Sequence, residues 1–468
     1  MSPKVSVAIL AAGLGTRMKS KKAKVLHKAG GLTLVEHVVR AAQTVAEPHR
    51  MVTVVGHQAE EVQKTLAPMG VRFVQQEQQK GTGHALSMCR AALQGAGDLL
   101  VVLYGDSPLL RAETLKELVR CQASSAAAAT LITTVLDEPA GYGRIVRDAN
   151  GRVASIVEEK AASPAQKKIQ EINSGIYCFN SALLWKHLEE IQPNRASGEL
   201  YLTDMVEILR GHGYTVAPMV VNDSTELLGI NTRVDLAQVD RLLRERKTRE
   251  LMLSGVTIER PETVSVDADV VIGVDTILEA FTQVLGKSAI GQDCRVGTGS
   301  IVRDSTIEDG VIIDAYTLVG TSHVERGAQL GPFSRLRMEN HVEAGAHVGN
   351  FVELKKTRLG AKAKSMHLAY LGDSEIGGGV NIGAGTITCN YDGEGKHRTK
   401  IGKGSFVGSN STLVAPMEIG EGSYIAAGSV ITDPVPEDTL ALGRARQVVK
   451  PGWPSRRKGN RSPAVAKK

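Results

Sequence analysis

A glycine-rich segment near the start of the chain carries the first residues that could do chemistry. Residues 10–18 read LAAGLGTRM after a predicted strand, and Lys24 comes seven residues after Arg17. Backbone N–H groups in such a turn can face an anionic ligand, and the two cations can neutralise phosphates. Met18 stands where a dinucleotide-binding fingerprint has its third glycine, so this is not that motif. Two glycines after a strand are, by themselves, equally compatible with a tight turn.

A carboxylate and a second group of polar residues extend the chemistry. Asp106 directly follows the hydrophobic run 99–104, and the carboxyl end of a parallel strand is where such a sheet meets its ligand. Its hard oxygen atoms suit Mg²⁺, although an aspartate there is also a common turn former. In the second half, cations, amides and His367 recur at spacings that stacking would bring together. Histidine can act as a general base near neutral pH, but a lone histidine is more often structural.

Aliphatic residues recur at every sixth position through much of the second half. The first unbroken phase runs from Val266 to Val302, and the pattern continues, with slips of register, to Ile431. The 49 glycines and the aromatic content of only 4% agree with many turns around an aliphatic interior. This is the hexapeptide pattern of a parallel β-helix, in which three hexads complete one triangular coil. Between Thr388 and Ile401 the repeat breaks, which predicts a loop that displays binding groups.

The first 230 residues are organised differently. Apolar strand candidates at 5–11, 50–55, 99–104 and 128–135 alternate with amphipathic helical stretches, which indicates a mostly parallel α/β sheet. Residues 231–254 follow one long polar helical pattern, with Val234, Val239, Leu242, Leu243 and Leu251 on its apolar face. We therefore expect a domain at 1–230, a linker helix at 231–254, a β-helix domain at 255–449 and a tail at 450–468.

Charge and cysteine usage limit the partners. The formal net charge is +6, but residues 444–468 hold nine Lys or Arg and no acid, which predicts a disordered basic tail rather than a nucleic-acid groove. The five cysteines lie far apart without Cys-x-x-Cys spacing, which argues against disulfides and a zinc site. No run approaches the roughly 20 apolar residues of a membrane span. We expect a cytoplasmic protein that binds neither membrane nor nucleic acid.

Further motifs follow the glycine-rich segment in a specific order. They are QQEQQKGTGHA at 75–85, YGD at 104–106, GYGR at 141–144, Glu158, EINSG at 171–175 and GIN at 229–231. These blocks resemble sugar-1-phosphate nucleotidylyltransferases. Together with the hexapeptide repeats, the chain from about Val5 to Trp453 resembles the bifunctional N-acetylglucosamine-1-phosphate uridyltransferase/glucosamine-1-phosphate acetyltransferase family, the GlmU family.

The resemblance implies a fold and a pair of reactions. The fold is a Rossmann-like, mostly parallel α/β nucleotidyltransferase domain followed by a left-handed parallel β-helix. The C-terminal domain would acetylate glucosamine-1-phosphate with acetyl-CoA, and the N-terminal domain would transfer UMP from UTP to N-acetylglucosamine-1-phosphate and release pyrophosphate. The product, UDP-N-acetylglucosamine, is a precursor of peptidoglycan and lipopolysaccharide. The family is similar in forming homotrimers, and its nucleotidyl transfer uses Mg²⁺.

The resemblance also implies the roles of individual residues. The catalytic residues would be His367, Arg17 and Lys24, and the metal ligands Asp106 and Asn231. UDP-N-acetylglucosamine would be bound by Leu10, Ala11, Ala12, Gly13, Lys24, Gln76, Gly81, Thr82, Tyr104, Gly105, Asp106, Gly141, Glu158, Asn173 and Asn231. Glucosamine-1-phosphate would be bound by Arg337, Lys355, Tyr370 and Asn381. Acetyl-CoA would be bound by Ala384, Asn390, Tyr391, Ser409, Ala427 and Arg444.

The chain departs from the family pattern at two places, and two alternative functions are also compatible with its domains. Ala23 precedes Lys24 where the family usually has proline, which predicts a looser loop, and Met338-Glu339 replaces a common Pro-Gly beside Arg337. One alternative is a single-activity nucleotidyltransferase with a regulatory solenoid, which His367 and the loop at Asn390 oppose. The other is a non-catalytic scaffold of the same two domains, which Arg17, Lys24 and Asp106 oppose.

Overall fold

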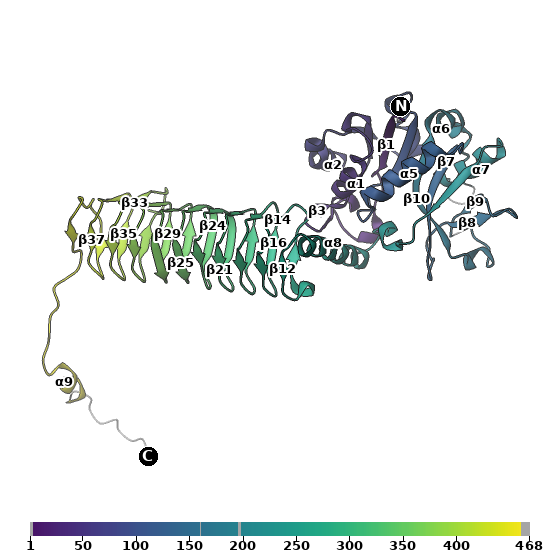
Figure 1. Ribbon diagram of the computed structural model, residues 1–468. Helices are drawn as coiled ribbons and strands as arrows, with labels where there is room; N and C mark the ends of the chain where they lie inside the picture. Colours follow the sequence, from purple (N-terminus) through teal and green to yellow (C-terminus); the bar gives the residue numbers. More distant parts are fainter. Residues whose placement is uncertain (1–2, 160, 195–197, 460–468) are drawn as a thin grey trace, which may run out of the picture. The chain divides into compact units, whose positions relative to one another are not determined.

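The computed structural model describes residues 3–159, 161–194 and 198–459. The chain divides into two compact units, Met1–Lys247 and Thr248–Lys468, each with its own hydrophobic core (Figure 1). None of the helices in the described ranges has both the length and the apolar character that crossing a membrane requires.

A twisted sheet forms the centre of the N-terminal unit. Its strands follow the order β11-β7-β10-β6-β1-β4-β5, with β1, β4, β5 and β6 parallel and β10 antiparallel to β6 and β7. The bounds are β1 (Val5–Leu10), β4 (Met51–Val55), β5 (Arg72–Gln75), β6 (Leu99–Tyr104), β7 (Ala129–Val135), β10 (Glu171–Asn180) and β11 (Val216–Val220). A hairpin of β8 (Arg144–Arg147) and β9 (Val153–Val157) extends from β10. The four strands predicted from sequence are present to within one residue at their ends.

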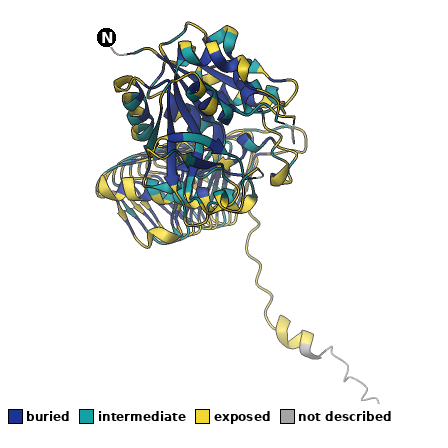
Figure 2. Cartoon of the chain, turned by 90° about the vertical axis from the view of Figure 1, so that its right-hand side faces the viewer, coloured by how far each residue is buried: buried dark blue, intermediate teal, exposed yellow. Residues whose placement is uncertain are grey.

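Helices cover both faces of this sheet. Side chains alternate across β1, so Val7 and Ile9 enter one core while Ala8 and Leu10 enter the other. The first face is covered by α1 (Leu34–Ala42), α2 (Ala59–Leu66) and α5 (Ala112–Ser124), and the second by α3 (Thr82–Ser87), α4 (Arg90–Leu93), α6 (Ser181–His187) and α7 (Met205–Gly211). Figure 2 shows the strands as buried and the outer helix faces as exposed.

The C-terminal unit is a parallel β-helix, as the hexapeptide period predicts. Its short strands run from β12 (Thr257–Ile258) to β39 (Leu440–Ala441), three to a coil, and pair in parallel with the coils before and after them. Partners are 18 residues apart in some coils, such as Val266 with Val284, and 17 in others, such as Ile290 with Ile307. The aliphatic positions predicted from Val266 to Ile431 all lie in one buried core.

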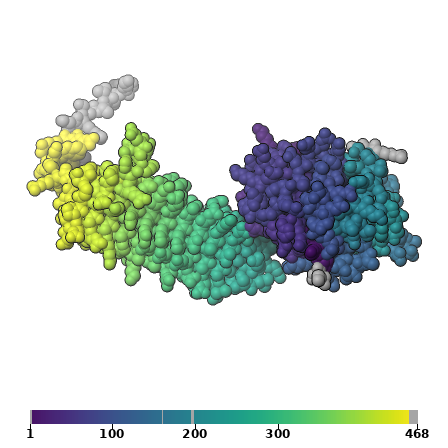
Figure 3. Space-filling model, turned by 90° about the horizontal axis from the view of Figure 1, so that it is seen from above, coloured from purple at the N-terminus to yellow at the C-terminus, as the bar shows by residue number. Residues whose placement is uncertain are grey.

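The strands that matter for the second site lie in the later coils. They are β22 (Leu318–Val324), β24 (Arg335–Val342), β25 (His347–Asn350), β26 (Glu353–Lys355), β28 (Lys364–His367), β29 (Tyr370–Gly372), β31 (Asn381–Ile382), β32 (Ile387–Cys389), β33 (Thr399–Ile401), β34 (Phe406–Val407) and β37 (Tyr424–Ile425). The loop predicted after Thr388 leaves the coil between β32 and β33 and is closed by a bridge between Tyr391 and Lys396. In Figure 3 it is the yellow-green knob that stands out from the solenoid.

The predicted long helix is α8 (Arg233–Leu253). Val239 packs with Met18 in the N-terminal unit, whereas Leu251 belongs to the core of the β-helix. Val234 is 76% exposed, so its assignment to the apolar face was wrong. Within the predicted tail, α9 (Trp453–Gly459) is a short helix in which the guanidinium of Arg457 lies 5.1 Å from the Trp453 ring centroid. The rest of that tail, 460–468, lies outside the described residues.

Two candidate functional sites

The glycine-rich turn after β1 places Lys24 at the carboxyl edge of the sheet. Gly15 has a φ of 59°, and a Cβ there would lie 2.7 Å from Cβ of Lys24. Only glycine gives both the left-handed backbone and the room that this turn needs. Ala23 keeps a proline-like φ of −54°, and its N–H donates to the side-chain oxygen of Gln58 at 2.7 Å, a bond that proline cannot make. The Gln58 bond anchors the loop in which the family usually has proline.

A cavity of about 430 Å³ opens where β1, β5 and β6 end. Of the residues expected to bind the nucleotide sugar, those that line it are Leu10, Ala11, Ala12, Gly13, Lys24, Gln76, Gly81, Thr82, Tyr104 and Asp106. Gly81, with a φ of 101°, must be glycine because a Cβ would lie 2.4 Å from the carbonyl oxygen of Leu200. The Thr82 hydroxyl accepts from the N–H of Leu202 at 3.0 Å. Ten of the fifteen residues thus converge on one hollow of the sheet edge, whereas Gly105, Gly141, Glu158, Asn173 and Asn231 are not among those that line it.

Cations and oxygen donors meet at one end of this cavity. The Lys24 ammonium pairs with the Asp106 carboxylate and lies 3.4 Å from Oδ1 of Asn231. Arg17 donates to the same Asn231 oxygen at 2.8 Å. Carboxylate and amide oxygens are ligands that Mg²⁺ prefers, and here both already face a positive charge. These oxygen atoms therefore fit a magnesium ion. The Lys24 ammonium already contacts the same oxygens that would coordinate the ion.

Glu158 and Asn173 lie near the Gly141–Gly143 turn. The N–H of Asn173 donates to the carbonyl of Gly143 at 2.9 Å, and a Cβ on Gly143 would lie 3.7 Å from both carboxylate oxygens of Glu158. The hydroxyl of Thr203 donates to Glu158 at 3.4 Å. Burial raises the pKa of Glu158, and the hydrogen bond from Thr203 opposes that shift only in part. Three elements thus bring a carboxylate, an amide and a turn to one place.

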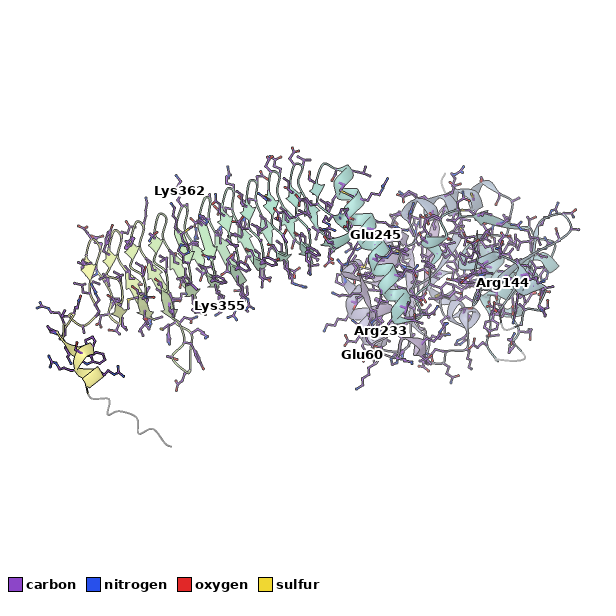
Figure 4. The ribbon with its side chains drawn as sticks, turned by 90° about the horizontal axis from the view of Figure 1, so that it is seen from below. Glu60, Arg144, Arg233, Glu245, Lys355 and Lys362 are labelled. Carbon is purple, nitrogen blue, oxygen red and sulfur yellow. The ribbon has the colours of Figure 1, made fainter. Side chains whose placement is uncertain are left out.

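Arg144 holds this turn from within the protein. Its side chain is 2% exposed, donates to the carbonyl oxygen of Tyr142 and pairs with Glu159 at 2.7 Å. Oε2 of Glu159 also accepts from the N–H of Gly141 at 3.4 Å. One guanidinium therefore fixes both sides of the Gly141–Gly143 turn. Figure 4 shows the labelled Arg144 among the side chains of the N-terminal unit.

His367 ends a strand of the β-helix and carries a defined hydrogen bond. Its Nδ1 lies 2.8 Å from Oδ1 of Asn350, its register partner on the preceding coil. Because an amide oxygen only accepts, this contact is compatible with the tautomer in which Nδ1 carries the proton and Nε2 presents a lone pair. The His367 side chain is exposed, and Tyr370 begins the next strand after the corner at Leu368. This is the arrangement that a general base needs.

A charged cluster lies at the far end of the next strand, β29, where Asp373 forms the following corner of the coil. Arg337 and Lys355 are register partners on consecutive coils, and Lys355 pairs with Asp373 at 2.8 Å. Asn390, from the inserted loop, also donates to Asp373. Burial raises the pKa of Asp373, but the bonds from Lys355 and Asn390 outweigh it and lower the pKa below its ordinary value. In Figure 4 the labelled Lys355 and Lys362 project to opposite sides of the solenoid.

Four of the residues expected to bind acetyl-CoA follow one corner of successive coils, namely Ala384, Ser409, Ala427 and Arg444, whereas Asn390 and Tyr391 lie on the inserted loop. The carbonyl of Ala384 accepts from the N–H of Asn410, and that of Ser409 accepts from Gly428, beside Ala427. A Cβ on Gly428 would lie 3.9 Å from the Arg444 side chain, which places Arg444 at the end of this row. Tyr391 is 55% exposed on the inserted loop, under the Lys396 ammonium at 4.0 Å from its ring centroid. Asn381 stands three residues before Ala384 and pairs in register with Lys364 and Phe406.

The turn next to Arg337 is strained. Met338 and Glu339 have φ values of 47° and 53°, two consecutive side-chain-bearing residues in the left-handed region. Each such residue costs about 1 kcal/mol relative to glycine. The Lys356 N–H donates to the carbonyl of Met338 at 3.0 Å, and the Lys356 ammonium lies 3.5 Å from Glu339. These bonds offset part of the cost of replacing Pro-Gly at this turn.

Comparisons with known proteins match both units. Residues 7–171 match the MobA-like NTP transferase domain, and residues 398–433 match the bacterial transferase hexapeptide (six repeats). A bifunctional protein GlmU from Solibacter usitatus is 58% identical over 458 residues, which cover 98% of each chain. The chain belongs to the GlmU family. A GlmU from Koribacter versatilis is 49% identical and covers 97% of each chain, and one from Anaeromyxobacter dehalogenans is 48% identical and covers 98% of this chain and 94% of its own. Among solved structures, a putative glucose-1-phosphate thymidylyltransferase from Bacillus anthracis is 22% identical, with a TM-score of 0.42 over 52% of this chain and 96% of that one.

Several residues that shape the sites of this GlmU-family chain were not predicted. Asn350, Gln58, Glu159 and Thr203 act on site residues through hydrogen bonds. Asn350 could have been found from the coil length, since it stands 17 residues before His367. Arg144 was part of a quoted motif, but its burial against Glu159 has no sequence signal.

Proposed function

We propose that this GlmU-family chain makes UDP-N-acetylglucosamine in two steps, acetyl transfer in the β-helix and uridylyl transfer in the α/β unit. The observation that carries the proposal is the presence of two complete and different sets of reactive groups. One set joins Lys24, Asp106 and Asn231 at a sheet edge. The other presents Nε2 of His367 at the end of β28 and the Lys355 cluster at the end of the next strand, β29. UTP and acetyl-CoA are the cosubstrates that these two reactions require.

In uridylyl transfer, a phosphate oxygen of N-acetylglucosamine-1-phosphate attacks the α-phosphorus of UTP. The bond from that phosphorus to the bridging oxygen breaks, and its electron pair leaves with pyrophosphate. Arg17 and Lys24 offset the negative charge that develops on the leaving group. Glu158 and Asn173 orient the sugar, beside the turn that Arg144 holds in place. Asp106 and Asn231 would hold Mg²⁺, which supplies further charge neutralisation to the phosphates when bound.

In acetyl transfer, the C2 amine of glucosamine-1-phosphate attacks the thioester carbonyl of acetyl-CoA. Nε2 of His367 takes the proton from the amine, and that proton passes to the departing CoA thiolate as the C–S bond breaks. The cations Arg337 and Lys355 match the sugar phosphate, and Lys355 can exchange Asp373 for it. Tyr370 and Asn381 complete that pocket. The corner row from Ala384 to Arg444, with Asn390 and Tyr391, receives acetyl-CoA.

A homotrimer is the assembly we propose, because the β-helix exposes an aromatic ladder at one corner. Tyr316, Phe333 and Phe351 stack on successive coils with centroid separations of 5.3 and 5.5 Å. Phe333 and Phe351 are 48% and 56% exposed, and Leu368, beside His367, continues the row. An exposed apolar row of this length is typical of an interface. A second copy packed on this corner would lie next to the acetyl-transfer site.

We propose that the two activities are separable at α8, with the domain bounds 1–230, 231–254, 255–449 and 450–468. The two ends of α8 belong to different cores, which supports independent folding of each side. A fragment that begins at Ser254 lacks Leu251, so it should acetylate but unfold at a lower temperature than the full chain. Loss of both activities from two folded fragments would contradict this division.

The Asp106→Ala variant tests the proposed function. Uridylyl transfer should fall by several orders of magnitude, because the variant removes the carboxylate that faces Lys24 and the proposed metal. Acetyl transfer by the same protein should be unchanged and serves as the internal control. A chain that releases pyrophosphate but never consumes acetyl-CoA would be a nucleotidyltransferase with a regulatory solenoid, and one that does neither would be a scaffold.

A further inference from the structure

Three side chains that neither reaction uses meet beside α6 and α7. His187 ends α6, Glu190 ends the short helix η6 (Leu188–Glu190), and His212 directly follows α7 (Figure 1). Nδ1 of His187 lies 2.6 Å from Oε1 of Glu190, and Nε2 of His212 lies 2.8 Å from Oε2 of the same carboxylate. One carboxylate therefore joins two imidazoles that come from two different helices.

The geometry of the cluster leaves a defined set of donor atoms. One donor atom from each residue lies within 4.8 Å of the other two, and the imidazole centroids are 4.1 Å apart. The His187 side chain is buried and its Nε2 has no hydrogen-bond partner, so Nδ1 is the nitrogen directed at the cluster. His212 and Glu190 are each 45% exposed, which gives an ion access and leaves room for a water ligand.

The chemistry of these donors favours a transition metal over magnesium or calcium. Imidazole nitrogens suit zinc, copper and nickel, whereas Mg²⁺ and Ca²⁺ prefer oxygen. Two histidines and one glutamate with a water form a known tetrahedral zinc environment, with metal-to-ligand distances of about 2.0–2.2 Å. The donors must draw together around an ion, and the half-exposed side chains of His212 and Glu190 have room to do so by exchanging their present hydrogen bonds for the ion, while buried His187 stays fixed.

We propose that His187, Glu190 and His212 form a binding site for Zn²⁺ or a similar divalent transition metal. The ion would clamp the end of α6 to the end of α7. It would also stabilise the nucleotide site indirectly. The segment just before α7 donates hydrogen bonds to that site, from Leu202 to Thr82 and from Thr203 to Glu158. The site is separate from the nucleotide cavity, since its residues are not among those that line it.

Calorimetric titration of Zn²⁺ into the full chain tests the site, with millimolar Mg²⁺ present to occupy the oxygen ligands of the nucleotide site. The wild type should bind one more equivalent of Zn²⁺ than His212→Ala or Glu190→Gln. His49→Ala is the matched control, because His49 is an exposed histidine 3.6 Å from Glu47 but, in the described part of the chain, belongs to no group of three possible metal ligands. This variant should bind Zn²⁺ like the wild type. Uptake by the five free cysteines is common to all four proteins and cancels in the comparison.

A thermal readout separates this site from binding elsewhere. Zn²⁺ should raise the unfolding temperature of the α/β unit by several degrees in the wild type and in His49→Ala, but not in His212→Ala. Because His212 is half-exposed, His212→Ala should fold, and Mg²⁺-dependent uridylyl transfer without zinc verifies that it has. Equal binding to the wild type and His212→Ala, or no binding to either, would overturn the proposal. Loss of uridylyl transfer from the wild type would count against the proposed function and leave the zinc result unaffected.

Discussion

Removing the Arg144 guanidinium should weaken binding of the sugar phosphate and leave acetyl transfer untouched. Arg144→Met keeps much of the length and apolar volume of the side chain but deletes the contacts to Tyr142 and Glu159. Glu159 is 31% exposed and can turn toward water, so the fold should survive. The Gly141–Gly143 turn, however, loses the group that holds both of its sides.

The size of the effect follows from the contacts that are lost. Hydrogen bonds to a charged group contribute about 1.5–3 kcal/mol each. If the free energy of one such bond goes into ordering the turn, its loss lowers the binding-competent population, and the apparent affinity for N-acetylglucosamine-1-phosphate falls by the same factor, about 10- to 100-fold. Arg144→Lys should lie between the wild type and Arg144→Met, because one ammonium cannot span both acceptors as a guanidinium does.

Steady-state measurement of pyrophosphate release gives the decisive numbers. KM for the sugar phosphate should rise by the factor above, while kcat and the KM for UTP change by less than about threefold. Arg147→Met is the control, because Arg147 lies on the same strand and is also ion-paired, with Glu171 at 2.7 Å. An equal rise of KM in both variants, or no rise in a folded Arg144→Met, would refute a positioning role for Arg144.

Three further predictions concern the base, the buried carboxylate and the assembly. His367→Ala should lower acetyl transfer by about 10²- to 10⁴-fold and remove the acidic limb of its pH–rate profile, and a variant that keeps the parent rate and limb would make His367 structural. Because burial raises the pKa of Glu158, this carboxylate gains its proton at a higher pH than an ordinary glutamate as the solution is acidified. As the pH falls through this range, KM for the sugar phosphate should rise in the wild type but not in Glu158→Gln. Equal pH dependence of KM in the two proteins would show that protonation of Glu158 does not control binding. Phe333→Asp should shift the sedimentation coefficient from trimer toward monomer, and Lys362→Asp, at another corner, should not; a trimeric Phe333→Asp would place the interface elsewhere.

The solenoid could be predicted from the sequence in unusual detail because its interior repeats. Every predicted position from Val266 to Ile431 is buried, since three strands a coil impose the same environment at every sixth residue. Val319 and Leu371 share that core but were not predicted, because coils of 17 rather than 18 residues shift the phase around them. Val234 was placed on an apolar face of α8, yet solvent surrounds it, since a helix period alone does not say what lies opposite a side chain.

The sites could be predicted only as far as motifs name their residues. Side chains that follow strands, such as Asp106, converge because parallel strands end at one edge. The Ala23 bond to Gln58 was not predictable, because it joins residues from separate loops. The sequence indicated a loosened loop there, whereas the structure has a hydrogen bond that restrains it.

The last strand of the β-helix, β39, lies in its final coil and, within the described part of the chain, pairs only with β37. In a solenoid each coil is held by its neighbours alone, so an end coil frays far more readily than one in the middle. Amide hydrogen exchange should therefore be fastest at the corner that carries Arg444 and slowest around Arg337. On warming, the affinity for acetyl-CoA should fall before the affinity for the sugar phosphate does. Heat inactivation of acetyl transfer should therefore begin with the loss of acetyl-CoA binding.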